Sequence, residues 1–168
     1  IGRAEIMDQF GPGSMSSTHT GNPVCCAAAL ANLKKIAAEH LTENAASMGK
    51  ILEAGLKEIQ QRHAEVIGRS ACRGLVGGLQ MTKPGKRKPN YDLAHDVIER
   101  CFHKGLLFSG PVGAWGQTVK IAPPLTITEE AVREGLAVLN EAVDEAVAAT
   151  KQPAKRERRE PATNGVLG

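Results

Sequence analysis

Residues 118–130 read TVKIAPPLTITEE and hold three structural signals in one short run. The first five residues favour a short β-strand, and the two prolines end it because proline has no N–H to donate to a sheet. Thr128 then suits the N-cap of a helix, and the two glutamates after it occupy the first turn, where the helix dipole favours carboxylates. The run therefore predicts a strand, a stop and a capped helix, whose buried stripe would be Val132, Leu136, Leu139, Val143 and Val147.

The first half of the chain predicts two helices and a glycine-rich segment. Apolar residues at helical spacing favour helices over about residues 23–38 and 42–62. Gly49 and Gly55 weaken the second helix, and close packing against another element would explain them. The glycine-rich residues 64–82 favour one or two short strands with bends.

The second half adds a helix and a strand before the final strand and helix. Asn90 is placed to cap a helix whose last turn holds His103 and Lys104, and Gly105 follows as a C-terminal signal. Residues 106–108 favour a short strand, and a glycine-rich loop comes after them. This order predicts an α+β fold, with a small antiparallel or mixed sheet covered by helices on one face.

The composition is that of a globular chain. Of 168 residues, 42% are hydrophobic and only 3% aromatic, and the formal net charge is +3, so we expect an aliphatic core. No stretch is long enough to cross a membrane, and no leader pattern opens the chain. The basic cluster at residues 155–159 lies in a proline-containing tail, so we expect a solvated terminus and no nucleic-acid binding.

The four cysteines favour neither a disulfide framework nor a metal site. Cys25 and Cys26 are adjacent on a predicted helix, and Cys101 lies two residues before His103, which places them on different helix faces. No Cys-x-x-Cys pair is present. We therefore expect structural thiols, no metal and a cytoplasmic location.

Residues 13–23, GSMSSTHTGNP, form a hydroxyl-rich loop directly before the first long helix. Asn22 is a good N-cap, and Pro23 suits the first helical position because no N–H is needed there. Such a loop offers O–H donors, free N–H groups and the positive end of a helix dipole, which favour a bound anion, most often phosphate. The alternative is an ordinary capped helix start.

The same loop carries a family resemblance. Residues 17–23, STHTGNP, with CCAAAL at residues 25–30, resemble the Ser-Thr-x-x-Gly-Asn-Pro segment of class III aminotransferases. These are the pyridoxal-phosphate enzymes related to ornithine, acetylornithine and 4-aminobutyrate aminotransferases. Residues 118–130 are similar to the terminal signature of that family, and residues 104–107 match its Gly-Leu strand start. The resemblance covers about residues 1–149.

The resemblance implies a fold and a division of the chain. The fold would be the C-terminal portion of a fold-type I pyridoxal-phosphate-dependent transferase, in which the small sheet is preceded by the end of a large α/β domain. Residues 1–39 would end that cofactor-binding domain, residues 40–149 would form the small C-terminal domain, and residues 150–168 would be a disordered basic tail.

The resemblance also implies site residues. Thr18 would hydrogen-bond the phosphate of pyridoxal 5'-phosphate in the neighbouring subunit of a homodimer with shared active sites, and Ser17 and nearby N–H groups would assist. Lys120 stands where many relatives have an arginine that holds the substrate carboxylate with a bidentate fork. Lysine keeps the charge but loses that two-point geometry, so Lys120 either holds an anion or points to solvent. Trp115, between glycines, either lines the site entrance or packs.

The resemblance places no catalytic residue within the chain. The lysine that forms a Schiff base with the cofactor would lie shortly before the segment that matches Ile1, and so would the aspartate that pairs with the pyridinium nitrogen. The first residues are typical of the middle of a protein. We therefore expect a fragment that is inactive alone.

The sequence leaves three functions open. The first is a class III aminotransferase, an enzyme that moves an amino group from an amine or amino acid to a 2-oxo acid in two half-reactions. The second is a racemase, decarboxylase or lyase on the same fold, because the cofactor stabilises a carbanion whichever bond breaks. The third is a non-catalytic domain that packs against a partner.

Overall fold

The computed structural model describes residues 2–11, 13–14, 17–18 and 21–151. The chain divides into two compact units, Ile1–Thr42 and Glu43–Gly168. The division into domains expected at residues 39 and 40 stays a prediction. The expected disordered tail lies outside the described residues from position 152 onward.

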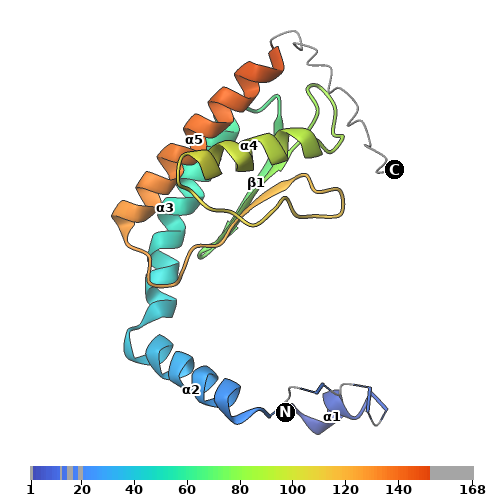
Figure 1. The fold of residues 1–168 in the computed structure, drawn as a ribbon, viewed down its shortest axis with the longest axis vertical. Helices are drawn as coiled ribbons and strands as arrows, with labels where there is room; N and C mark the ends of the chain where they lie inside the picture. Colours follow the sequence, from blue (N-terminus) through green and yellow to red (C-terminus); the bar gives the residue numbers. More distant parts are fainter. Residues whose placement is uncertain (1, 12, 15–16, 19–20, 152–168) are drawn as a thin grey trace, which may run out of the picture. The chain divides into compact units, whose positions relative to one another are not determined.

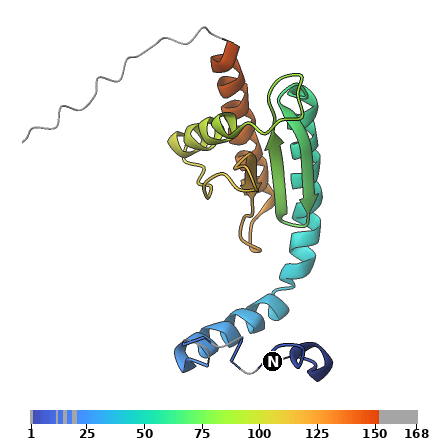
Figure 2. The same ribbon diagram turned by 90° about the vertical axis from the view of Figure 1, so that its right-hand side faces the viewer.

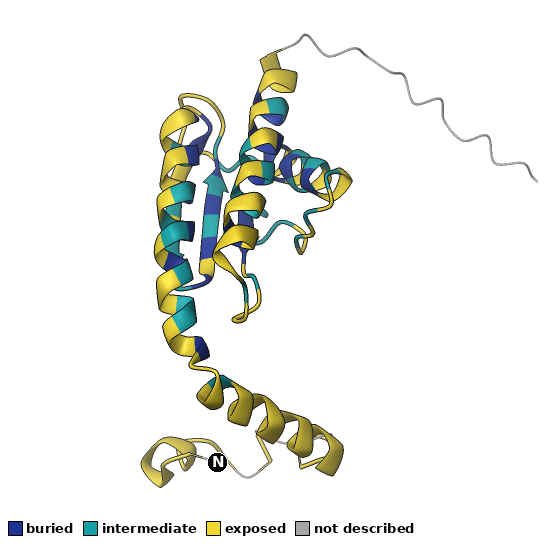
Figure 3. Cartoon of the chain, turned by 90° about the vertical axis from the view of Figure 1, so that its left-hand side faces the viewer, coloured by how far each residue is buried: buried dark blue, intermediate teal, exposed yellow. Residues whose placement is uncertain are grey.

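The first unit contains two helices, α1 (Ala4–Met7) and α2 (Pro23–Ala38). The predicted helix over residues 23–38 is confirmed, because α2 begins at Pro23 directly after its cap and ends at Ala38. None of the side chains of α2 is buried (Figure 3). Its larger apolar side chains, Val24, Leu30 and Leu33, are exposed.

The second unit is built on a three-stranded antiparallel sheet (Figure 1). Its strands are β1 (Ile67–Arg73), β2 (Val76–Met81) and β3 (Thr118–Ile121), in the order β1-β2-β3. The glycine-rich segment is therefore a hairpin, and Gly74, at its turn, has a φ of 55° that favours glycine. The predicted sheet, antiparallel or mixed, is confirmed and is antiparallel in both strand pairs.

Three helices cover one face of this sheet: α3 (Leu41–Arg62), α4 (Tyr91–His103) and α5 (Glu129–Lys151). Figure 2 shows α3 behind β1 and β2, with no helix drawn in front of these two strands. The buried core combines side chains from all three helices with the alternate strand residues that face them. It includes Leu52, Leu56, Ile59, Leu79, Val97, Val119, Leu139 and Val143.

We call the opposite side of the sheet the outer face. Its positions follow from the pairing register, since residues directly opposite each other on neighbouring strands share a face. They are Arg69, Ala71, Arg73, Val76, Gly78, Gln80, Thr118 and Lys120. None of these residues is buried.

The predicted strand at residues 106–108 is wrong. Gly105, with a φ of 85°, reverses the chain at the end of α4. The Gly105 N–H donates to Phe102 O, and the Leu106 N–H donates to Cys101 O over 2.8 Å. This is a Schellman arrangement, which satisfies the last carbonyls of a helix. The N–H of Leu106 is therefore used by the helix end and cannot join a sheet.

Close helix packing explains the two glycines of α3. A Cβ at Gly49 would lie 2.5 Å from the carbonyl oxygen of Gly74, in the hairpin turn. A Cβ at Gly55 would overlap the side chain of Leu136 in α5. These glycines let the hairpin and α5 approach α3 more closely than a larger residue would allow.

Polar contacts tie α3 and α4 to α5. His63, at the end of α3, is buried, and its Nε2 lies 2.7 Å from Asp144 Oδ1. Lys104 Nζ lies 2.8 Å from Glu141 Oε1 and 2.8 Å from Glu145 Oε1. Hydrogen bonding by Lys104 is the main cause that lowers the pKa of Glu145, although desolvation opposes it. The carboxylates of α5 thus anchor both neighbouring helices.

Candidate functional site

The hydroxyl loop is described only in part. Ser17 and Thr18 are exposed, with Thr18 in a turn. Met15, Ser16, His19 and Thr20 lie outside the described residues. The roles expected for Ser17 and Thr18 therefore stay predictions.

The start of α2 confirms the cap expected at Asn22. Asn22 Oδ1 accepts from the Val24 N–H over 3.0 Å and from the Cys25 N–H over 3.2 Å. The Cys26 N–H donates to Asn22 O over 2.9 Å, and Pro23 has no N–H. The expectation of free N–H groups in the first turn is thus wrong, because Asn22 satisfies them.

Lys120 lies on the outer face of the second unit. Its neighbours in β3, Val119 and Ile121, are buried, and Lys120 itself is exposed. Gly78 stands opposite it on β2. No ion pair or hydrogen bond joins the ammonium of Lys120 to any described residue. The side chain is therefore open to an external anion.

The loop before β3 presents an aromatic side chain. Val112 and Thr118 exchange two backbone hydrogen bonds of 3.0 Å, which close the loop at its base. Within it, the Trp115 N–H donates to Gln117 Oε1 over 3.2 Å. The Trp115 side chain is 70% exposed, so it is not packed in the core of this chain. The loop can therefore offer an indole ring to a molecule near the start of β3.

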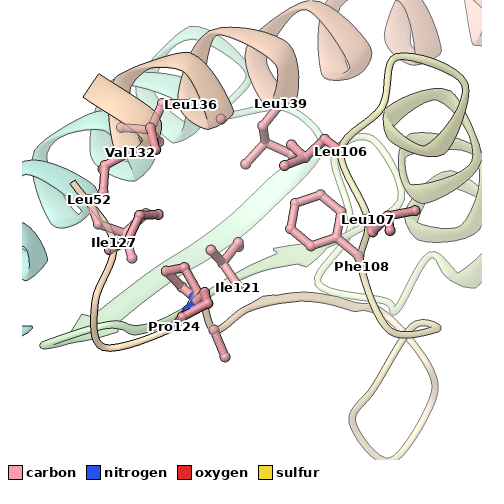
Figure 4. A pocket seen from close by; sticks show the side chains of 14 residues that line it. Leu52, Leu106, Leu107, Phe108, Ile121, Pro124, Ile127, Val132, Leu136 and Leu139 are labelled. Carbon is pink, nitrogen blue, oxygen red and sulfur yellow. The ribbon is translucent and has the colours of Figure 1, made fainter. Parts of the chain in front are cut away.

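An apolar cavity of about 370 Å³ lies within the second unit. Figure 4 shows Leu106, Phe108 and Leu139 among the side chains directed toward it. Its other lining residues are also apolar and include Ile121, Pro124 and Ile127. The lining holds no acid, base or nucleophile, so the cavity can bind a hydrophobic group but offers no catalytic side chain.

The thiols show no site chemistry. All four cysteines are free, and Cys25 and Cys26 are exposed. Burial raises the pKa of the Cys101 thiol to about 11, which keeps it protonated near neutral pH. Desolvation, followed by the charge of Glu53, also raises the pKa of Cys72. Within the described chain, no three His, Cys, Asp or Glu side chains are grouped as metal ligands.

The chain matches one protein family over a range that includes both segments described above. The model of class III aminotransferases matches residues 1–143, a range that includes both the hydroxyl loop and β3. This chain belongs to the class III aminotransferase family. The predicted family and the α+β fold are confirmed. None of the helices that the structure describes is long and apolar enough to span a bilayer.

Relatives in this family differ in the reaction they are named for. The chain is 37% identical over 145 residues to 5-aminovalerate aminotransferase DavT of Pseudomonas aeruginosa, covering 86% of this chain and 34% of that enzyme. It is 35% identical over 146 residues to 4-aminobutyrate aminotransferase GabT of Escherichia coli, covering 86% and 34%. It is also 36% identical over 143 residues to alanine/serine racemase of Pyrococcus horikoshii, covering 85% and 29%. The chain spans about a third of the length of these relatives.

Solved structures of similar fold likewise include proteins that are named for different reactions. A transaminase from the marine bacterium Virgibacillus has a TM-score of 0.71 at 28% identity, covering 87% of this chain and 34% of that one. A phospholyase from Arthrobacter, in complex with phosphoethanolamine, has a TM-score of 0.70 at 33% identity, covering 89% and 34%.

The sequence did not single out three residues that share the outer face with Lys120. Arg69, Gln80 and Thr118 occupy one row across the three strands. Residues 64–82 contain four glycines and therefore show no clear alternation of polar and apolar side chains. Only the observed pairing register of the strands reveals this row. Among the three strands, only β3 shows a clear alternation of polar and apolar residues in its sequence.

Proposed function

We propose that this chain is part of an enzyme that transfers an amino group from an amine or amino acid to a 2-oxo acid. The family match over residues 1–143 carries this proposal, since it is continuous across both units. Two of the relatives described above are aminotransferases for ω-amino acids. Because the chain spans about a third of their length, the activity is proposed for the whole protein.

The cofactor we propose is pyridoxal 5'-phosphate, which, when bound, supplies an electron sink for the carbanion of the substrate. The hydroxyl of Thr18 would donate a hydrogen bond to its phosphate, and Ser17 would assist. Both side chains are exposed, which fits this role. The N–H groups at the start of α2 would contribute little, because Asn22 already accepts from them.

We further propose a homodimer with shared active sites, in which Thr18 serves the cofactor of the partner subunit, and a cytoplasmic location. Lys120 would hold an anionic group of the substrate, since its ammonium has no partner within the described residues. A lysine acts as a compact point charge and lacks the planar fork of arginine, so it would tolerate more varied anion positions.

A second candidate function is a racemase or lyase reaction on the same fold. The racemase of Pyrococcus horikoshii and the phospholyase of Arthrobacter match the chain about as well as the aminotransferases do. Product analysis with the whole protein separates the two candidates. A strict requirement for a 2-oxo acid acceptor supports aminotransfer, whereas product formation without an acceptor supports the second candidate.

The role of Thr18 has its own test. In the whole protein, we expect Thr18→Ala to weaken pyridoxal 5'-phosphate binding by about tenfold or more, because a hydrogen bond to a charged group is lost. Thr18→Ser keeps the hydroxyl and should bind the cofactor nearly as well as the parent. Equal affinity of the alanine variant and the parent would show that Thr18 is not a phosphate contact. A whole protein that binds no cofactor would favour a non-catalytic packing domain.

A further inference from the structure

The segment between β2 and α4 carries four basic residues and no acid. Residues 82–90 read TKPGKRKPN, and we call them the basic loop. All four basic side chains are exposed, and Figure 2 shows this loop at the end of the strands. Their four positive charges outnumber the formal net charge of +3 of the whole chain, so the loop is a local excess of positive charge. They belong to Lys83, Lys86, Arg87 and Lys88.

The two ends of the basic loop pair with each other. Thr82 and Pro89 form an antiparallel β-bridge, and one residue further along, the Lys83 N–H donates to Lys88 O over 2.9 Å. The loop is therefore a short hairpin that extends β2 before the chain enters α4. Its backbone is ordered by hydrogen bonds of its own, so a partner that binds it would lose little conformational entropy in ordering it.

The tip of the basic loop is a tight turn. The Lys86 N–H donates to Lys83 O over 3.0 Å, which closes a turn of four residues. Pro84 and Gly85 occupy its two central positions, and Gly85 has a φ of 64°. Proline followed by a glycine of positive φ is the pattern of a type II turn. The turn fixes the direction in which the basic residues on either side of it leave the backbone.

The base of the basic loop is anchored to β1. The Thr82 N–H donates to Val66 O over 2.8 Å. The pairing of β1 with β2 shifts between Ile67 and Arg69, so Gly68 is the extra residue of a β-bulge. A Cβ at Gly68 would lie 2.7 Å from Thr82 Cγ2, so the glycine lets the loop approach the bulge closely. The loop is thus held in place from both sides of its first residue.

The four cations of the basic loop have no partner within the described residues. None of their side chains makes an ion pair or a hydrogen bond there. Lys83 and Lys88 also stand opposite each other in the hairpin. Like charges directly opposite each other destabilise a strand pair. Nothing in the described chain offsets this repulsion, whereas an anionic partner would.

The aromatic side chain that follows the basic loop is in contact with the rest of the chain. A Cβ at Gly116 would lie 2.5 Å from Tyr91 Cδ2, and the ring centroids of Tyr91 and His95 are 5.9 Å apart. The basic loop itself contains no aromatic or large apolar residue. Single-stranded nucleic acids use aromatic stacking, and membrane surfaces take up apolar side chains. The loop offers charge alone, which fits an acidic polypeptide better than either.

We propose that the basic loop, in its turn conformation, binds an acidic segment of another protein in which several Asp or Glu side chains lie close together in sequence. A single exposed ion pair contributes little to binding, so the loop requires several carboxylates at once. Such contacts are screened by salt, and the affinity should fall as the ionic strength rises. The inference is independent of the proposed aminotransfer.

The test uses a fluorescently labelled peptide of ten glutamates, and its binding to the full chain is followed by anisotropy at low ionic strength. We expect the double variant Lys86→Ala/Arg87→Ala to weaken binding by at least about fivefold. The matched control is Lys155→Ala/Arg156→Ala, which removes the same number of adjacent cations from the second basic cluster of the sequence. It should change the affinity by less than about twofold.

Two variants separate the shape of the basic loop from its charge. Lys86→Arg keeps the charge and should bind the peptide nearly as well as the parent. Gly85→Val keeps all four cations, but a β-branched residue disfavours the φ of 64°, so we expect binding to weaken by about twofold or more. Equal binding by Gly85→Val and the parent would overturn the proposal, because flexible charge alone would then suffice.

Two other polyanions complete the test. Trp115 is 70% exposed in the loop that meets Tyr91, so a labelled oligouridylate of ten nucleotides is the main competitor, and vesicles containing phosphatidylserine are the second. We expect both to bind more weakly than the acidic peptide. The proposal is overturned if the parent does not bind the peptide, if the control variant loses as much affinity as Lys86→Ala/Arg87→Ala, or if either competitor binds more tightly through the same loop.

These measurements need neither cofactor nor turnover. In the whole protein, Lys86→Ala/Arg87→Ala should leave aminotransferase activity unchanged while it weakens peptide binding. A whole protein without aminotransferase activity would refute the proposed function alone, and an active one whose basic loop binds no acidic peptide would refute this inference alone.

Discussion

The helical side of the second unit and the outer face of its sheet both carry lysine and arginine side chains. They differ in whether these side chains are paired with carboxylates. Lys104 is hydrogen-bonded to Glu141 and Glu145, which raise its pKa. Arg100 Nη1 also lies 3.2 Å from Glu145 Oε2. Lys120 and Arg69 have no such partner within the described residues. Charge on the helical side is used to join α4 to α5, whereas the cations of the outer face make no ion pair with any described residue.

This contrast separates the residues that stabilise the fold from those that are available for recognition. Along β2, Leu79 is fully buried and Gln80 next to it faces outward. Substitutions toward the helices should therefore change the free energy of unfolding, and substitutions on the outer face should change binding. Four predictions test that separation, and the expected effects become smaller from one to the next.

The largest effect is expected from Leu79→Ala. The side chain is fully buried in the core between the sheet and the helices, and its removal leaves a cavity. We expect the free energy of unfolding to fall by about 2–5 kcal/mol. Urea unfolding followed by circular dichroism measures it. A loss below about 1 kcal/mol would mean that the helical face is not the packed one.

Gly49→Ala should be the next most destabilising change. The new Cβ would lie 2.5 Å from the Gly74 carbonyl oxygen, so the hairpin turn or α3 must move. We expect a loss of about 1–3 kcal/mol, although alanine favours helix formation. Gly135→Ala in α5 is the matched control, since its nearest neighbour would be 3.8 Å away. It should stabilise by up to about 1 kcal/mol, and equal effects of the two variants would contradict this packing.

Lys120→Ala and Lys104→Ala compare the two faces directly. Lys120 has no partner within the described residues, so its removal should change the free energy of unfolding by less than about 0.5 kcal/mol. Lys104→Ala removes two hydrogen bonds to α5 and should lower that free energy measurably. Thermal unfolding of both variants with the parent decides the point. A larger loss of stability for Lys120→Ala than for Lys104→Ala would contradict the assignment of the two faces.

The smallest effect is expected on the stability of the fold at acidic pH. Lys104 keeps the pKa of Glu145 below its ordinary value in the folded chain, so below about pH 4.3 the unfolded chain binds more protons at this group. Its contribution to stability is therefore present above that pH and is lost as the pH falls further. Glu145→Gln should flatten the acid limb of a stability–pH curve, whereas Glu134→Gln, on the exposed side of α5, should not. An unchanged curve for Glu145→Gln would contradict the ion pair.

Helix boundaries were readable from the sequence because their signals are local. The cap expected at Thr128 is confirmed, since Thr128 Oγ1 accepts from the Ala131 N–H. The cap expected at Asn90 is confirmed by the hydrogen bond from the Leu93 N–H to its side chain. Phe102 is exposed although Cys101 beside it is buried, because consecutive residues of a helix point to different faces.

Sheet pairing was less accessible because it depends on residues far apart in the chain. The strand expected at residues 106–108 is not formed, because the N–H of Leu106 donates to a carbonyl at the end of α4. The outer face could not be assigned because an extra residue at Gly68 changes the alternation of β1. Thr18 and Ser17 were chosen through resemblance, and their roles are still predictions.

The bulge at Gly68 also affects how this strand tolerates changes in length. Removing Gly68 would leave Ile67 opposite Met81 and Arg69 opposite Gln80, as a regular ladder. Removing any residue from 69 to 72 would instead exchange the faces of its neighbours on one side. Among residues 68–72, a deletion is therefore neutral for side-chain orientation only at position 68, where we expect an alignment gap between this chain and a relative with a shorter strand.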